Sequence, residues 1–499
     1  MKAFRLSSFA ELDPDSGEPT LEVNFDAGRP DSPGAGEGTA SWTTILTGRN
    51  GGGKSRTLRA VTSLLAGSRE GRLRTRGARK LWEVRYSVGD TQYLVRTDRR
   101  EKVAVFKDGV EVAIEQAEFP SRIIAASAAA NDKFPNARRY PLPDDYYYYF
   151  GLRDATGRAS GIAPLLSALQ ALSAAEAGDA RRINAVATVF RLLGYREVLT
   201  HRYGWRYLRH LRQGESPSSL YVQGSLGPDA RHRIEGLLRH DPDVLEKLDA
   251  AVASAKITSS KSLFWEIEAD FSKENIGAKS NASREFSDSN LLRRAGLIRL
   301  ESVILKRLGD GALLDLREAS SGQISLATTF LGIAASITDG ALVLIDEPEI
   351  SLHPEWQAAY LGLAQRLFSS YTGCHFLVAT HSPSVVAGMS ETNANAVSLD
   401  LASVGPEVSS NYGGDSVDEL LVREFGVYES GNLFLQKELA RALDLASVGE
   451  ISSDAFRHAV EVISPAAIEL KDEPFGRLVA SLLRAAKHAD DSEVGSVSR

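Results

Sequence analysis

The stretch GRNGGGKS, Gly48-Arg49-Asn50-Gly51-Gly52-Gly53-Lys54-Ser55, fits the phosphate-binding pattern G-x-x-x-x-G-K-[ST] and decides the fold. Glycines let the backbone curl so that successive N–H groups point into one hollow, and the helix that follows adds the positive end of its dipole. In this pattern the lysine reaches the β- and γ-phosphates, and the serine hydroxyl is a ligand of Mg²⁺. The residues expected to bind a nucleoside triphosphate are Gly48, Asn50, Gly51, Gly52, Gly53, Lys54, Ser55 and Arg56.

The flanks of this loop have the composition that such a site requires. Residues 42–47 (WTTILT) are rich in β-branched side chains and predict a strand, whereas residues 55–65 (SRTLRAVTSLL) predict a helix. A chance glycine-rich loop is the alternative. The strand before the loop and the helix after it count against that alternative.

Composition places the chain among ordinary globular proteins. Its residues are 43% hydrophobic and 25% charged. A chain of 499 residues is too long for a single hydrophobic core, so two or more subdomains are expected. Cys374 is the single cysteine, so no internal disulfide can form, and a reducing cytoplasmic location is expected. The N-terminus lacks a signal-peptide pattern, and no apolar run is long enough to span a membrane. The net charge of −7 gives no overall indication of nucleic-acid binding.

A second candidate for catalytic chemistry follows a buried strand at residues 341–345 (ALVLI), which ends in Asp346-Glu347-Pro348. Two acids at the end of such a strand suit hydrolysis of a nucleoside triphosphate. The first, Asp346, would order Mg²⁺, and the second, Glu347, would polarise the attacking water. Two solvated acids are the alternative, which the upstream loop disfavours.

Three further motifs surround this strand. Ser320-Ser321-Gly322-Gln323 opens a predicted helix, where its backbone N–H groups could bind phosphate or Ser320 could be a plain N-cap. Ser351-Leu352-His353-Pro354 follows the two acids. Thr380-His381-Ser382 follows a second buried strand at residues 375–379.

The order of these motifs resembles the head of ABC-type ATPases. SSGQ resembles the signature motif of that family, SLHP resembles its D-loop, and His381 resembles the switch histidine that contacts the γ-phosphate. A long insert between the loop and the signature resembles the non-transporter branch, which includes RecF, SMC heads and OLD-like AAA ATPases. The wording IDEPEISLHPEWQ followed by ATHSP is closest to the OLD-like and Septu-like ATPases of phage defence. The resemblance is good over residues 40–60 and 315–390 and poor elsewhere.

This resemblance implies ATP hydrolysis with ATP and Mg²⁺ as cofactors. The active form would be a head-to-tail homodimer or a higher even oligomer. Each ATP would then lie between one P-loop and the partner's Ser320, Ser321, Gly322 and Gln323. Ser55 and Asp346 would bind the metal, Glu347 would be the general base, and His381 would stabilise the γ-phosphate. The cycle is expected to drive or gate a separate effector, with a nuclease in anti-phage defence as the first candidate. A RecF-like DNA-repair ATPase and an ATP-dependent scaffold with little turnover are the alternatives.

The sequence departs from the family in two places. The Q-loop glutamine has no clear counterpart, and the candidates for its position are Asn131 and Asp132. OLD nucleases carry a C-terminal nuclease domain, but no strand-borne glutamate followed by a D-x-D pair stands after residue 390. The chain is therefore expected to cleave no nucleic acid by itself.

Two basic segments are candidates for DNA or RNA contact. Residues 201–212 (HRYGWRYLRHLR) mix cationic and aromatic side chains, as phosphate contact and base stacking require, and residues 68–80 carry six basic side chains. A solvated face with its aromatic side buried is an equal alternative for residues 201–212. Four tyrosines at 146–149 are expected in the core.

We therefore predict an α/β fold: a P-loop NTPase of ABC-ATPase type with an antiparallel β subdomain, a helical insert and a helical C-terminal region. The predicted parts are an N-terminal lobe of the head (1–155), the helical insert (156–310), a C-terminal lobe of the head (311–402), a helical C-terminal region (403–486) and a disordered tail (487–499).

Overall fold

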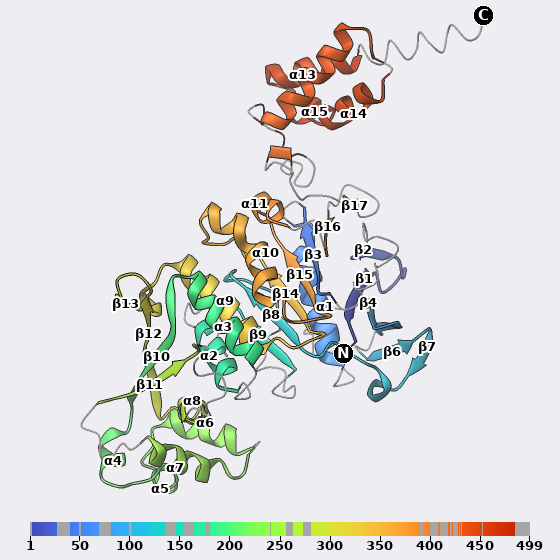
Figure 1. Cartoon of the computed structure of the whole chain (residues 1–499). Coiled ribbons are helices and arrows are strands. Elements are labelled where there is room, and N and C mark those ends of the chain that lie inside the picture. The colour runs from blue at the N-terminus through green and yellow to red at the C-terminus, as the bar shows by residue number, and fades with distance from the viewer. Residues whose placement is uncertain are drawn as a thin grey trace, which may run out of the picture.

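A computed structural model gives the architecture of the chain (Figure 1). The residues that it describes are 2–26, 40–48, 51–68, 81–98, 102–135, 146–153, 163–174, 180–239, 241–255, 263–272, 281–389, 393–399, 408–409, 418–419, 422, 428, 430, 432–451 and 453–484. The α/β class predicted above is confirmed, since sheets and helices both build the cores. Within these residues, no helix is long and apolar enough to cross a membrane.

A seven-stranded sheet forms the centre of the molecule, in the order β17-β16-β3-β15-β14-β8-β9. Its strands are β17 (Val408–Ser409), β16 (Ala394–Ser398), β3 (Trp42–Thr47), β15 (His375–Ala379), β14 (Leu342–Asp346), β8 (Ile123–Ser127) and β9 (Tyr147–Phe150). All neighbours run parallel except β17. β14, β15 and β8 are buried along their whole length, as expected for parallel strands covered on both faces.

The register of this sheet brings four strand ends to one level. Asp346 pairs with Ala379 on one side and Ser127 on the other, and Ala379 pairs with Leu46. The segments that follow β3, β15, β14 and β8 therefore leave the sheet at the same carboxyl edge. This is the edge where open parallel sheets bind ligands.

One face of the central sheet shares a core with α1 (Lys54–Ser68) and an antiparallel sheet. This second sheet has the order β2-β1-β4-β5-β6-β7. Its strands are β1 (Phe4–Leu12), β2 (Pro19–Asn24), β4 (Leu81–Val88), β5 (Thr91–Thr97), β6 (Val103–Lys107) and β7 (Val110–Val112). The predicted antiparallel β subdomain is confirmed. Turns at Gly89 and at Asp108-Gly109 adopt positive φ, which explains the glycines there.

The opposite face packs against helices and a third sheet, of order β11-β10-β12-β13. The elements on this side are α2 (Ala163–Ala174), α3 (Ala180–Leu192), β10 (Tyr195–Trp205), α4 (Leu208–Arg212), α5 (Pro217–Val222), α6 (Pro228–Leu238), α7 (Val244–Ser254), β11 (Phe264–Asp270), α8 (Asn281–Arg294), β12 (Ile298–Arg307), β13 (Leu313–Asp315), α9 (Ser321–Ser336), α10 (Pro354–Phe368) and α11 (Pro383–Ala387). In Figure 1, α9 and α10 lie beside the central sheet, whereas α4 to α7 lie farther from it.

The prediction of a helical insert is wrong for residues 195–205, 264–270 and 298–307, which form the long antiparallel strands β10, β11 and β12. The sequence contains the alternating pattern that is typical of such strands. In β11, Trp265, Ile267 and Ala269 are buried and alternate with exposed acidic residues, which is the period of a half-buried strand. The domain boundaries themselves stay predictions.

The C-terminal helices have a core of their own, which includes Leu435, Phe456 and Ile463. They are α13 (Leu433–Ser447), α14 (Asp454–Ile463), α15 (Ala466–Glu469) and a helical segment at 474–484. Figure 1 shows them apart from the central sheet. Most of residues 400–431 and the predicted disordered tail at 487–499 lie outside the described residues.

Two helical glycines make a matched test of this packing. A Cβ at Gly332 of α9 would lie 2.6 Å from the buried ring of Phe150, whereas one at Gly362 of α10 would meet nothing within 4 Å. Gly332→Ala is therefore expected to destabilise the fold by about 1–3 kcal/mol through overpacking. Gly362→Ala should stabilise it by about 0.5–1 kcal/mol through helix propensity. Thermal melts of both variants measure these changes in stability. Equal melting temperatures would contradict the α9–β9 packing.

Candidate functional site

The loop after β3 is shaped by glycines that other residues could not replace. Gly48, Gly51 and Gly53 have φ values of 118°, 86° and 103°, in the region that L side chains rarely adopt. A Cβ at Gly48 would lie 3.2 Å from the backbone of Leu399, so this position is also tight. Asn50, predicted to bind the nucleotide, lies outside the described residues, as does its neighbour Arg49.

Lys54 begins α1 and is almost completely buried, with 4% of its surface exposed. Its Nζ donates to the carbonyl oxygen of Gly48 at 2.6 Å. Burial lowers the pKa of Lys54 to about 8, although Glu349, Glu347 and Asp346 favour the charged form. A buried ammonium at a helix N-terminus is suited to an anionic ligand such as a phosphate chain.

Ser55 and Asp346 meet at the adjoining position. The Ser55 hydroxyl donates to Asp346 Oδ1 at 2.9 Å, although the two residues are far apart in the sequence. Asp346 is 2% exposed, and burial raises its pKa to about 7. The neighbouring acids Glu347, Asp132 and Glu349 raise it further, while the Ser55 hydrogen bond lowers it.

This pair fits a magnesium ion. A hydroxyl and a carboxylate are hard oxygen ligands, and Mg²⁺ is commonly held by one or two carboxylates together with substrate phosphates. Burial raises the pKa of this carboxyl group, and a divalent cation would favour its charged form. Among the described residues, no group of three or more His, Cys, Asp or Glu side chains forms an all-protein metal site.

Glu347 and His381 face each other at the ends of β14 and β15. Glu347 Oε1 lies 3.7 Å from His381 Nε2. Glu347 adopts φ of 50°, an unusual conformation for a side chain of this size, while its N–H donates to the Ala379 carbonyl at 2.9 Å. Burial, followed by the charge of Lys54, lowers the pKa of His381 to about 4. The imidazole is therefore neutral at neutral pH.

Glu349 is a site residue that the sequence reasoning missed. Its Oε1 accepts a hydrogen bond from the backbone N–H of His381 at 2.6 Å, and burial raises its pKa. It also contributes to the electrostatic environment of Lys54 and Asp346. The only signal was a third acid in Asp346-Glu347-Pro348-Glu349, which could as well have been solvated.

The SSGQ segment starts α9 next to the SLHP segment. Ser320 and Gln323 form a capping box, so the N-cap reading of Ser320 holds in the structure. A Cβ at Gly322 would lie 2.5 Å from the Ser351 carbonyl oxygen, so glycine permits this close approach. Ser320, Ser321 and Gln323 are exposed. Their placement leaves them accessible to another chain.

Asp132, considered above for the Q-loop position, follows β8 at the same edge of the sheet. It is 5% exposed and accepts hydrogen bonds from Tyr149 Oη at 2.6 Å and from Arg153 Nη2 at 2.6 Å. Asn131 is exposed. The Asp132 carboxylate is therefore engaged with β9 and the segment after it, which are structural contacts.

In the basic-aromatic segment 201–212, aromatic side chains are packed inward and arginines form ion pairs with acidic side chains. Tyr203 is buried and Trp205 stacks on Trp265, whereas Arg202 and Arg206 pair with Glu266 at 2.7 Å and Asp229 at 3.0 Å. These contacts favour the solvated-face alternative over a nucleic-acid site. The tyrosines at 146–149 lie in or against the cores, as expected. Of the other basic segment, residues 69–80 lie outside the described residues.

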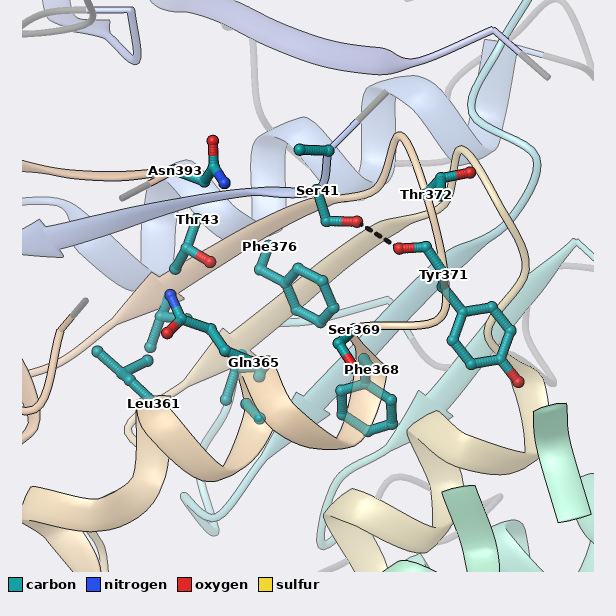
Figure 2. A pocket seen from close by; sticks show the side chains of 14 residues that line it. Ser41, Thr43, Leu361, Gln365, Phe368, Ser369, Tyr371, Thr372, Phe376 and Asn393 are labelled. Carbon is teal, nitrogen blue, oxygen red and sulfur yellow. Dashed lines mark hydrogen bonds between the residues drawn. The ribbon is translucent and has the colours of Figure 1, made fainter. Parts of the chain in front are cut away.

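A cavity of about 280 Å³ lies away from this site, under α10 (Figure 2). Phe368, Phe376 and Tyr371 line it together with hydroxyl and carboxamide groups, including Gln365. Neither the P-loop nor the acids after β14 line it. The candidate site is thus defined by the carboxyl edge of the sheet, not by this cavity.

Comparison with known proteins supports an ATPase domain. The family model described as "AAA domain, putative AbiEii toxin, Type IV TA system" matches residues 196–387, a range that includes Asp346, Glu347 and His381. No curated protein matches the sequence. This part of the chain is therefore similar to that family of AAA domains.

Solved structures show only a distant likeness. The SMC head domain from Thermotoga maritima is 12% identical with a TM-score of 0.34, over 79% of this chain and 94% of that chain. An ATPrS form of the recombination mediator RecF is 11% identical with a TM-score of 0.30, over 79% and 96%. MJ1267, an ATP-binding cassette of an ABC transporter, is 10% identical with a TM-score of 0.26, over 82% and 92%. At these values the likenesses carry no argument about function.

The raised pKa of Asp346 makes a pH-dependent prediction. The folded chain keeps this carboxyl protonated up to about pH 7, whereas the unfolded chain ionises it near pH 4, so its contribution to stability is lost as the pH rises between these values. Asp346→Asn imitates the protonated form and keeps an acceptor for Ser55. Without nucleotide and Mg²⁺ it should be more stable than wild type at pH 8, by on the order of 1–3 kcal/mol.

Thermal melts at pH 5 and pH 8 measure this difference, which should shrink at pH 5. Asp339→Asn, at an exposed ion pair with Arg181, is the matched control and should show no gain at pH 8. A wild-type chain as stable as Asp346→Asn at both pH values would contradict the burial of an uncompensated carboxylate.

Proposed function

We propose that this chain is an ATP-binding and ATP-hydrolysing enzyme of ABC type. The observation that carries the proposal is the gathering of five groups at one edge of the central sheet. Lys54 and Ser55 come from α1, Asp346 and Glu347 from the end of β14, and His381 from the end of β15, with Ser55 and Asp346 joined at 2.9 Å. A purely structural role would not explain why two ionisable side chains, Lys54 and Asp346, are both buried at this edge.

Each group has a role that its environment supports. Lys54 and the loop N–H groups would bind the phosphates, and Ser55 with Asp346 would hold Mg²⁺, which neutralises phosphate charge during transfer. Glu347 would accept the proton of the attacking water. Neutral His381 would donate one N–H to a γ-phosphate oxygen, and its lowered pKa keeps it neutral over the physiological range.

The shared-site dimer is part of the proposal. Ser320, Ser321 and Gln323 are exposed at the start of α9, and Gly322 contacts the Ser351 backbone. An exposed helix N-terminus can present N–H groups to a partner's phosphates. Each ATP would then lie between one chain's P-loop and the other chain's SSGQ.

We further propose that the cycle acts on a separate effector, with a nuclease of phage defence as the first candidate. Two observations support this. The wording of the motifs resembles the OLD-like and Septu-like ATPases, and the matching family model is described as a toxin-type AAA domain. In residues 201–212, Arg202 and Arg206 form ion pairs with acidic side chains. These ion pairs count against direct contact of the segment with DNA or RNA.

Glu347→Gln tests the catalytic assignment. The amide keeps the shape of the side chain but cannot accept a proton, so hydrolysis should fall by about 10²–10⁴-fold while ATP affinity is retained. Phosphate release and calorimetric titration with ATP measure the two effects. Glu355→Gln, the same change at an exposed acid of α10, is the matched control and should turn over normally. Wild-type turnover by Glu347→Gln would place the base elsewhere.

A cysteine crosslink tests the shared site. Cys374 is first replaced by serine, and cysteines are introduced at Ser321 and Arg49 in one chain. A short bis-maleimide should join two chains with ATP present, because SSGQ would then lie opposite the partner's P-loop. The product should have the mass of a dimer on a denaturing gel. A crosslink within single chains, or equal yield without nucleotide, would rule out the head-to-tail arrangement.

A further inference from the structure

Two side-chain bridges join the segment after β14 to the segment after β15. The first is the Glu349 carboxylate, which accepts the backbone N–H of His381 at 2.6 Å. The second is Gln357, in the first turn of α10. Its Nε2 donates to the Leu352 carbonyl at 3.0 Å, and its Oε1 accepts from the Ser382 hydroxyl at 2.6 Å.

The carboxamide of Gln357 therefore uses both of its ends. One end fixes the backbone of the SLHP segment, since Nε2 also approaches the Glu349 carbonyl at 3.5 Å. The other end holds the residue that directly follows His381. Ser382 is 8% exposed, and its N–H donates to Thr380 Oγ1 at 2.9 Å, so the three residues 380–382 are held as one unit.

The backbone to which Gln357 is tied is itself constrained. Ser351 adopts φ of 66°, a conformation uncommon for a residue other than glycine. Its carbonyl oxygen faces Gly322, where a Cβ would lie 2.5 Å away. A continuous set of contacts thus runs from the start of α9 through residues 351–352 and Gln357 to Ser382, and from there to His381 beside Glu347.

We propose that Gln357 is a positioning residue for the hydrolysis reaction. By tying Ser382 to the Leu352 carbonyl, it holds the His381 imidazole at its place 3.7 Å from Glu347 and couples that place to the SLHP and SSGQ segments. The inference rests on the proposed ATPase function and adds to it a residue that touches no reacting atom.

The physical reason is geometric. Catalytic groups that rely on hydrogen bonds to a phosphate lose much of their effect when they move by about 1 Å. His381 lies on the segment after β15, where Glu349 accepts its backbone N–H and Gln357 holds its neighbour Ser382. On the N-terminal side of His381, the Thr380 N–H is also anchored, to the Leu46 carbonyl at 3.1 Å. Without the second bridge, the C-terminal side loses its side-chain tie to the SLHP segment, which would let the direction of the imidazole change.

Gln357→Met is the deciding variant, because methionine has a similar length and makes no comparable hydrogen bonds. Gln365→Met is the matched control: it lies on the same helix, is also half-buried, and lines the cavity of Figure 2 away from residues 349–352 and 380–382. We expect Gln357→Met to lower kcat at least tenfold and to change the Kd for ATP less than twofold. Gln365→Met should change neither.

Ser382→Ala completes a double-mutant cycle. If the hydroxyl acts through Gln357, the double variant should have the kcat of Gln357→Met, and the two single effects should not multiply. Multiplying effects would overturn the proposal. If Gln357→Met melts much earlier than Gln365→Met, Ser382→Ala decides alone, and an unchanged kcat in that variant overturns the inference.

Different results would overturn the proposed ATPase function and the proposed role of Gln357. A wild-type chain that binds ATP but releases no phosphate overturns the proposed function, and the role of Gln357 with it. A wild-type chain with normal turnover beside a Gln357→Met variant of equal kcat overturns the role of Gln357 only. A loss of ATP affinity equal to the loss of kcat would make Gln357 a structural residue of the nucleotide site.

Discussion

The parallel register of β3, β15, β14 and β8 is the constraint on which the site depends. Because Leu46, Ala379, Asp346 and Ser127 stand side by side in the sheet, the four following segments emerge at the same level. A slip of one residue would turn each strand over, since successive side chains point to opposite faces. Asp346 would then face away from Ser55, so the packing that fixes the register of the sheet also fixes the position of the chemistry.

Burial gives the site its electrostatic character. Lys54 and Asp346 are nearly inaccessible, and desolvation moves the pKa of each toward its neutral form. The charged forms of both groups thus lack full compensation, at the two places where a phosphate chain and a divalent cation would supply it. Neighbouring acids offset part of the desolvation cost of Lys54, and the Ser55 hydroxyl offsets part of that of Asp346. Binding of these ligands would offset more, so the ligand-free site is a destabilised part of the fold.

The sequence predicted the elements whose signals are local. The P-loop needs glycines at fixed offsets, and buried parallel strands read as unbroken apolar runs, so residues 48–55 and 341–346 were identified from the sequence alone. The strands of the insert were missed because residues 195–205 hold charged side chains between the apolar ones and follow two helices. Glu349 and Gln357 could not be found in this way. Their contacts join segments that the sequence separates, and only the sheet brings His381 beside them.

The insert packs against two helices that carry residues of the proposed site. It departs from the central sheet after β9 and returns at α9, so both of its ends lie on the same side of the sheet. Within it, α2 and α3 pack against α9, and α3 also contacts α10. Arg181 adds a salt bridge to Asp339 at 3.0 Å. Since α9 starts with SSGQ and α10 carries Gln357, the insert packs on both of the helices to which the proposal assigns the shared site and the positioning of His381. An effector or nucleic acid bound to the insert would thus have a direct mechanical route to both, without any contact with ATP.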